Sequence, residues 1–96
     1  MKANNLTDYI YLCMRDQEWW TFWDLQTVIK EKTNGKFYGE PSISAAIRNI
    51  RKDRYRQRYK IDSSIDDPIE RKRIVNGKGY KYRLIFKNKE RANEKN

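Results

Sequence analysis

Positively charged side chains are concentrated between residues 48 and 60, where almost every second residue is Arg or Lys. Guanidinium and ammonium groups donate charge-assisted hydrogen bonds to anionic oxygens, and the arginine fork can bind two such oxygens at once. Arg48 is followed directly by Asn49, whose side-chain amide adds a neutral polar group. These residue types predict an anionic partner.

The charge is distributed unevenly along the 96-residue chain, whose net charge is +9. Residues 1–40 contain five basic and six acidic residues, a net charge of −1. Residues 41–96 contain 17 basic and seven acidic residues, a net charge of +10. The positive field is therefore concentrated on the elements that the second half forms.

Patterns typical of catalysis or metal binding are weak in this sequence. The chain contains no histidine, and its single cysteine, Cys13, lies among apolar residues at helical spacing. We find no pair of carboxylates in a setting that suggests a tuned acid and base, no metal-ligand spacing and no glycine-rich phosphate loop. We therefore expect a protein that is not an enzyme and uses no metal or cofactor.

Length and composition favour one small domain in a reducing compartment. The 14% of aromatic residues supplies bulky side chains for a single core. One cysteine cannot form an internal disulfide, and no apolar run reaches the roughly 18 residues of a membrane span. We expect a cytoplasmic protein with one domain over residues 1–87, a disordered polar tail over residues 88–96 and no membrane contact.

Two amphipathic helices are predicted in the first 33 residues. Apolar residues recur at three- and four-residue spacing within residues 5–17, with Asn5 or Thr7 as the cap. Thr21 and Asp24 approximate a capping box for a helix over residues 22–33, which Asn34 and Gly35 then end. Residues 19–21 suggest a short extended piece between them. The expected buried side chains are Leu6, Tyr9, Ile10, Cys13, Met14, Phe22, Leu25, Val28 and Ile29.

A third helix is predicted over about residues 41–53, with Pro41 in its first turn. At about 100° per residue its apolar side chains fall on one face, and small, amide and basic side chains fall on the opposite face. The apolar face consists of Ile43, Ala46, Ile47 and Ile50, and the opposite face carries Ser42, Ala45, Arg48, Asn49 and Lys52.

The remaining chain predicts a loop and a β-hairpin. Residues 54–61 fit both a helix and a strand, so their conformation stays open, and residues 62–68 are typical of a loop. Asn76 and Gly77 then lie between two runs rich in β-branched and aromatic residues, which predicts a hairpin. Alternation places Tyr80, Tyr82, Leu84 and Phe86 on one face of its second strand and Lys81 and Arg83 on the other.

This order of elements resembles a winged helix-turn-helix domain over residues 5–87. The stretches "PSISAAIRNIRK" and "IERKRIVNGKGYKYRLI" look like the recognition helix and wing of small bacteriophage and prophage winged-helix proteins. The resemblance implies an α+β fold with three helices, a C-terminal β-hairpin wing and a short third strand near residues 19–21. It also implies a sequence-specific binder of double-stranded DNA, associated with the nucleoid of a bacterial host cell, that regulates transcription, replication or recombination.

Three segments are expected to contact DNA under this interpretation. The helix over about residues 41–53 would enter the major groove, residues 54–60 would follow phosphates, and the wing would lie along a minor groove with Lys78 at its tip. The expected DNA-binding residues are Ser42, Ser44, Ala45, Arg48, Asn49, Lys52, Arg54, Arg56, Arg58, Lys60, Arg71, Arg73, Lys78, Lys81 and Arg83.

Other interpretations of the same residues stay open. The cations fit a solvated surface, and charges on an edge hairpin also prevent aggregation. An adaptor of the same fold would bind a host or phage protein, and an RNA or single-strand binder would stack bases on Trp19, Trp20 and Trp23. We expect a core role for these tryptophans, although all three cannot face inward at this spacing. A homodimer is compatible with the sequence.

Overall fold

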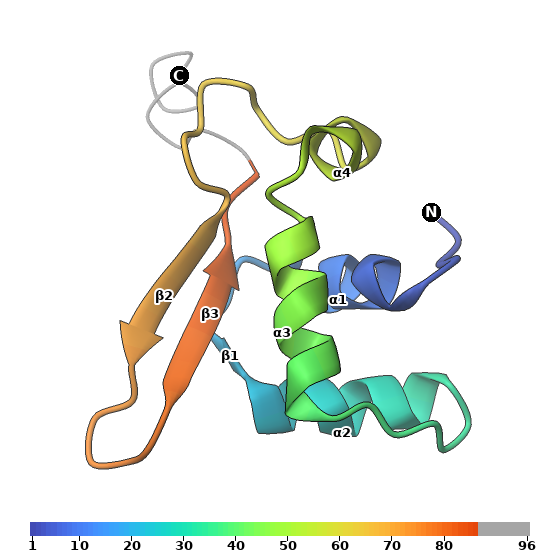
Figure 1. Ribbon diagram of the computed structural model, residues 1–96, viewed down its shortest axis with the longest axis vertical. Helices are drawn as coiled ribbons and strands as arrows, with labels where there is room; N and C mark the ends of the chain where they lie inside the picture. The colour runs from blue at the N-terminus through green and yellow to red at the C-terminus, as the bar shows by residue number, and fades with distance from the viewer. Residues whose placement is uncertain (87–96) are drawn as a thin grey trace.

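The computed structural model describes residues 1–86 and has an α+β fold with four helices and a three-stranded antiparallel sheet (Figure 1). The tail predicted over residues 88–96 lies outside the described residues. Within residues 1–86, no helix is long and apolar enough to cross a membrane. The elements are α1 (Leu6–Met14), β1 (Trp20–Thr21), α2 (Phe22–Lys32), α3 (Glu40–Asn49), α4 (Asp53–Arg58), β2 (Ile69–Arg73) and β3 (Tyr80–Leu84).

The first two helices begin at the caps that the sequence predicts. Asn5 caps α1, because its side chain accepts a hydrogen bond from the backbone N–H of Asp8 at 2.9 Å. At α2, Thr21 accepts from the N–H of Asp24, and the Asp24 carboxylate accepts from the N–H of Thr21. The predicted capping box is therefore confirmed. Gly35, at φ 102°, follows the end of α2 in the left-handed region that favours glycine.

The third helix is shorter than predicted, and a fourth helix follows it. Pro41 lies in the first turn of α3 as expected, but the helix ends at Asn49. Lys52 is extended, with φ −73° and ψ 142°, and α4 begins at the next residue. The predictions of one helix continuing to about residue 53, and of three helices in the domain, are therefore wrong.

The break between α3 and α4 follows from the packing of two tyrosines. In one continuous helix Tyr55 and Tyr59 would lie about 140° and 180° around the axis from Ile50, and would face away from the core. The break turns both rings inward, and all three side chains are buried. Tyr11 of α1 stacks on Tyr59 with 4.1 Å between ring centroids. Burial of two large rings favours the broken helix over the continuous one.

The sheet has the strand order β1–β3–β2, and both pairings are antiparallel. Trp20 pairs with Tyr82, which confirms the predicted short third strand. Across the hairpin Ile69 pairs with Leu84. Asn76 has a φ of 59° in the connection between β2 and β3, a conformation that asparagine tolerates better than most residues. The predicted hairpin is therefore present, and β1 joins it to the beginning of α2.

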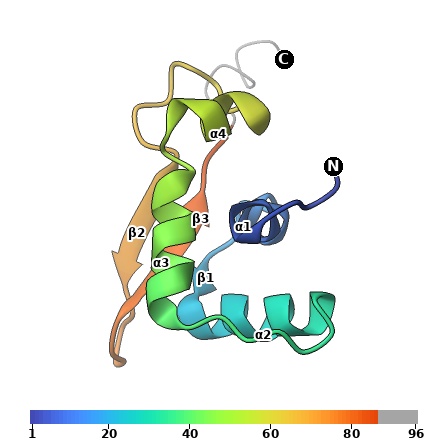
Figure 2. The same cartoon turned by 45° about the vertical axis from the view of Figure 1, so that its right-hand side comes forward.

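The helix α3 is the central element of the fold. In Figures 1 and 2 it lies between the hairpin and α1, and α2 passes close to its N-terminal end. All four of its predicted core residues are buried against α1, α2 and β3. This packing fixes which face of α3 remains at the surface. The centre of the core contains Ile43, Ala46, Ile47 and Ile50 of α3 together with Ile10, Met14, Leu25, Ile29 and Leu84.

Candidate nucleic-acid interface

A cationic groove, here called the α3–hairpin groove, lies between α3 and the two long strands. It is a surface pocket of about 170 Å³ to which α2, α3, the turn after α3 and the hairpin contribute. Three of its seven lining residues are arginines, and none of the seven is acidic. The lining residues are Phe22, Ser44, Ile47, Arg48, Arg51, Arg71 and Tyr82.

Helix geometry explains the α3 side of the groove. Ser44, Arg48 and Arg51 follow one another at intervals of four and three residues, so successive turns place them along one side. Ser44 is half-buried, whereas Arg48 and Arg51 are exposed. Ser42 and Ala45, both short side chains, lie on neighbouring positions of the same helix. A ligand can therefore approach the helix backbone closely between the two arginines and the N-terminal turn.

The pairing register decides which hairpin cations face α3. Arg71 pairs with Tyr82 and Arg73 pairs with Tyr80, so these four side chains share one face of the sheet. The guanidinium of Arg71 lies 4.5 Å from the centroid of the Tyr80 ring. This contact orients Arg71 without neutralising its charge. The groove thus receives positive charge from two elements that are distant in sequence.

The opposite face of the hairpin packs on Trp19. The cationic groups of Lys72, Lys81 and Arg83 lie 5.7, 5.7 and 4.7 Å from the centroid of its ring. Arg83 also donates to both carboxylate oxygens of Glu70, at 3.0 Å each. Lys81 and Arg83 were predicted to contact DNA, but both are half-buried in internal contacts on the face away from α3. The wing cations are therefore divided between two faces.

Arg56, predicted to follow phosphates, stabilises the loop after α4 instead. Its guanidinium donates hydrogen bonds to the backbone carbonyls of Asp62, Ile65 and Asp66. These contacts connect α4 to the segment that leads into β2. The loop between α4 and β2 is thus held by a side chain from the preceding helix.

Arg58, also predicted to contact phosphates, forms an ion pair with the fully buried Asp8. Its guanidinium donates to both carboxylate oxygens at 2.8 and 2.6 Å, and the hydroxyl of Tyr59 donates to the same carboxylate at 2.6 Å. The Arg58 hydrogen bond outweighs burial and lowers the pKa of Asp8 to about 2. Burial raises the pKa of Tyr59, and pairing with Asp8 raises the pKa of Arg58. Arg58 therefore joins α4 to α1.

Asn49 faces α1 and not the groove. Its side-chain amide donates to the hydroxyl of Thr7 at 3.3 Å, and it is half-buried between the two helices. Arg48 and Asn49 were both predicted to contact DNA from the helix in the major groove. The fold separates them, because consecutive helical residues point about 100° apart. Only Arg48 lines the groove.

The other predicted residues are not among those that line the groove. Lys78 is exposed in the hairpin tip, and Lys60 directly follows α4. The guanidinium of Arg54 lies 4.7 Å from the centroid of the Tyr55 ring and donates to its hydroxyl at 3.0 Å. Ala45 is half-buried. The exposed members of the predicted set, besides Arg48, Arg58 and Arg71, are Ser42, Lys52, Arg54, Lys60, Arg73 and Lys78.

Arg51 also lines the groove, although it is not among the residues predicted to contact DNA. Its Nε donates to the carboxylate of Asp67 at 2.9 Å, and both side chains are largely exposed. Burial acts to raise the pKa of Asp67, but the hydrogen bond from Arg51 and further contacts lower it overall. An exposed pair of this kind is weak enough to yield to another anion. The spacing from Ser44 and Arg48 is the signal that would have identified it.

Comparison of the chain with protein-family models, curated proteins and solved structures finds no match. Among residues 1–86 there is also no group of three or more His, Cys, Asp or Glu residues that could hold a metal ion. Cys13 is buried, and burial raises the pKa of its thiol to about 11, which disfavours the reactive thiolate at neutral pH. Function is therefore inferred from the α3–hairpin groove itself.

Proposed function

We propose that the chain is a winged helix-turn-helix protein that binds double-stranded DNA. In this proposal α2 and α3 form the helix-turn-helix, α3 enters the major groove, and the hairpin of β2 and β3 is the wing. The major groove admits one α-helix, and its base edges offer acceptors to arginine. A regulator of transcription, replication or recombination in a bacterial or phage setting is the role that we infer.

The convergence of three guanidinium groups in the α3–hairpin groove is the observation that carries this proposal. Arg48, Arg51 and Arg71 come from a helix, a turn and a strand, and none of the seven lining residues is acidic. Arg51 also pairs with the exposed Asp67 outside this lining. Like charges held close together repel one another, so the arrangement favours an anion in the groove. A phosphodiester backbone supplies such anions at regular spacing along a groove wide enough for α3.

The residues have different roles in the proposed complex. Arg48 is positioned to pair with guanine, since its fork matches the two acceptors of that base in the major groove. The short side chains of Ser42 and Ala45 allow close approach of the helix. Arg71 and Lys78 neutralise phosphates beside the helix and at the hairpin tip, and these contacts orient the protein without reading sequence.

The proposal is tested by titrating a fluorescently labelled random duplex and following its anisotropy. Arg48→Ala and Arg71→Ala should each weaken binding, by a factor of about five or more, because each removes a groove cation. Lys32→Ala removes an exposed cation at the end of α2 and serves as the matched control. Equal binding by all four proteins would contradict the proposed interface.

An adaptor that binds another protein is the alternative that one observation favours. A pocket with tryptophan and carboxylate side chains lies outside the α3–hairpin groove and shares none of its lining residues. An adaptor without DNA affinity would ignore random duplex at physiological salt. A single-strand binder would instead bind poly-pyrimidine strands and quench tryptophan fluorescence.

A further inference from the structure

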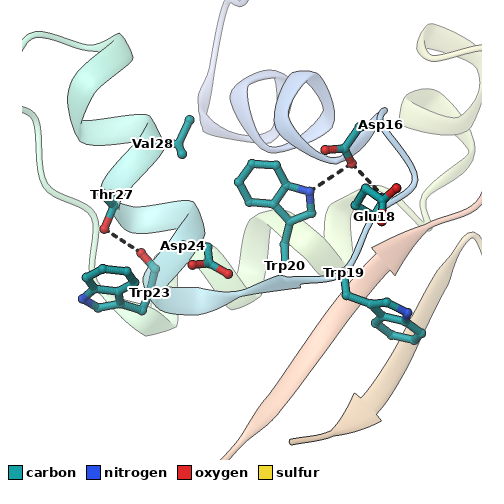
Figure 3. A pocket seen from close by; sticks show the side chains of 8 residues that line it. All are labelled: Asp16, Glu18, Trp19, Trp20, Trp23, Asp24, Thr27 and Val28. Carbon is teal, nitrogen blue, oxygen red and sulfur yellow. Dashed lines mark hydrogen bonds between the residues drawn. The ribbon is translucent and has the colours of Figure 1, made fainter.

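A second pocket lies where the chain passes from α1 through β1 into α2 (Figure 3). Its volume is about 310 Å³, larger than that of the α3–hairpin groove. Figure 3 shows Trp20 turned toward Asp16, Trp19 turned toward the hairpin, and Trp23 at the far end beside Thr27. We call it the tryptophan pocket, and its lining residues are Asp16, Glu18, Trp19, Trp20, Trp23, Asp24, Thr27 and Val28.

The tryptophan pocket has the chemistry of a site for a cation. None of its eight lining residues is basic, although the whole chain carries a net charge of +9. Two of its polar hydrogens are already used, since Trp20 Nε1 donates to Asp16 at 3.0 Å and the Thr27 hydroxyl donates to the Trp23 carbonyl at 2.9 Å. The pocket offers mainly carboxylate oxygens and indole faces. Both groups attract guanidinium and ammonium ions.

Trp19 contributes less than the other two indoles to an incoming ligand. Its ring is already contacted by the hairpin cations described above. Trp20 is half-buried and is held by Asp16, whereas Trp23 is 70% exposed. The accessible aromatic surface of the pocket is therefore provided mainly by Trp23.

The apolar surface continues beyond the tryptophan pocket to Phe37. A neighbouring hollow of about 200 Å³ shares Trp23 and Thr27 with the pocket and is completed by Gln26, Lys30 and Phe37. Trp23 and Phe37 are 70% and 65% exposed, so two large aromatic side chains are left in contact with water side by side. A small ammonium ion would fill the first pocket only. An extended ligand with a cationic and an apolar group would cover both.

We propose that this surface docks a segment of a partner protein that presents a Lys or Arg side chain next to an apolar side chain. The cation enters the tryptophan pocket near Asp16 and Glu18, and the apolar side chain packs on Trp23 and Phe37. Charge complementarity selects this partner, because the lining of the pocket has three carboxylates and no basic side chain. The surface shares no lining residue with the α3–hairpin groove, so DNA in the groove would leave these residues uncovered.

Selection from a random peptide library displayed on a carrier tests the proposal, with the full chain as bait. The expected result is enrichment of peptides in which Lys or Arg adjoins Leu, Ile, Phe or Trp. A synthetic copy of the most enriched peptide should quench tryptophan fluorescence. A peptide variant in which Glu replaces the Lys or Arg should bind at least about tenfold more weakly than the original peptide.

Matched variants assign the binding to this surface. Glu18→Lys and Trp23→Ala change exposed side chains of the pocket, and each should weaken the peptide by about tenfold. Glu31→Lys makes the same change of charge at an α2 residue outside both hollows. The affinity of this variant for the peptide should stay within about twofold of that of the wild-type protein. A far-ultraviolet circular dichroism spectrum checks that each variant is folded.

Three results would overturn the proposal. No enrichment, or enrichment of acidic or uncharged peptides, would show that the surface does not select a cationic segment. Peptide binding that survives both pocket variants would place it elsewhere. Concentration-dependent self-association in sedimentation velocity that Trp23→Ala abolishes would assign the surface to a second copy of this chain.

Discussion

Asp8 is the residue on which the junction of α1 and α4 depends. It is 0% exposed, and its carboxylate receives hydrogen bonds from the side chains of Arg58 and Tyr59 and from the backbone of Asn4. Removing the charge would leave the guanidinium beside a neutral amide in a site built for a carboxylate. Only the Asp8 side of this pair is fully buried, since Arg58 reaches the surface. Removing the charge of a buried carboxylate that holds a guanidinium is nevertheless destabilising.

Asp8→Asn should lower the free energy of unfolding by about 2 to 3 kcal/mol at pH 7. The pKa of Asp8 is about 2 in the folded protein, below the value of about 3.9 in an unfolded chain. Its contribution is therefore present above about pH 4 and is lost as the pH falls toward about 2. Urea unfolding at pH 7 and pH 3 measures both effects, with Glu31→Gln as the exposed control. An unchanged stability at pH 7 would contradict the role of Asp8.

Ile47 and Arg48 are neighbours with opposite expected roles. Ile47→Ala removes a buried side chain from the centre of α3 and should cost about 2 to 5 kcal/mol of stability by leaving a cavity. Arg48→Ala changes an exposed side chain and should leave stability within about 0.5 kcal/mol. The same change should weaken duplex binding by about 1 to 3 kcal/mol and relax base preference at one position. Thermal unfolding and binding to a panel of duplexes separate the two effects, and the reverse pattern would mean that α3 is rotated.

The hairpin is an element whose two faces have different environments. The face with Arg71 is directed toward α3, whereas Lys81 belongs to the face that packs on Trp19. A cation already held against an indole and surrounded by other cations is less available to a phosphate than one lining an open groove. The structure therefore distinguishes Arg71 from Lys81, although both were expected to contact DNA.

Arg71→Ala should weaken duplex binding more than Lys81→Ala does. The first change removes a groove cation, and a factor of about five or more is expected, while the second should change affinity by less than about twofold. Lys78→Ala should weaken all duplexes by a similar factor, because a point charge at the hairpin tip contacts phosphate without reading bases. Anisotropy titrations of the three variants at one salt concentration provide the comparison. A larger loss for Lys81→Ala would place the DNA on the Trp19 face.

The helix starts and the hairpin could be predicted because their signals are local. Asn5, Thr21 with Asp24, and Pro41 each act within one turn of their own helix. Asn34 and Gly35 have left-handed backbone shortly after α2 ends at Lys32. The end of α3 has no such signal. The position of this end depends on the packing of Tyr55 and Tyr59 in the core, and that packing depends on the complete fold.

The candidate site was predictable where it follows helical periodicity and unpredictable where partners are distant. Arg48 was found from its position opposite the apolar stripe of α3. Arg58 and Asn49 are residue types that also occur at nucleic-acid interfaces, but here they bind within the protein. Their partners Asp8 and Thr7 lie 50 and 42 residues away in the sequence. No local pattern distinguishes an arginine that binds a buried carboxylate from one that faces solvent.

At the scale of the whole molecule, charge is separated between two surfaces. The α3–hairpin groove collects arginines from the basic second half, whereas the tryptophan pocket collects carboxylates from the first half. If both proposals hold, this separation would let DNA and a cationic partner segment bind to different surfaces. Net charge alone would predict only weak, general attraction to anions.

The salt dependence of duplex binding is the most direct test of the proposed DNA interface. If the groove, the residues around α4 and the hairpin tip neutralise about four to six phosphates, a plot of log K against log salt concentration should have a slope of about −3.6 to −5.4. Arg71→Ala should reduce the magnitude of the slope by about one, while Lys32→Ala should leave it unchanged. A wild-type slope shallower than about −2 would contradict an extended phosphate interface on this face of the protein.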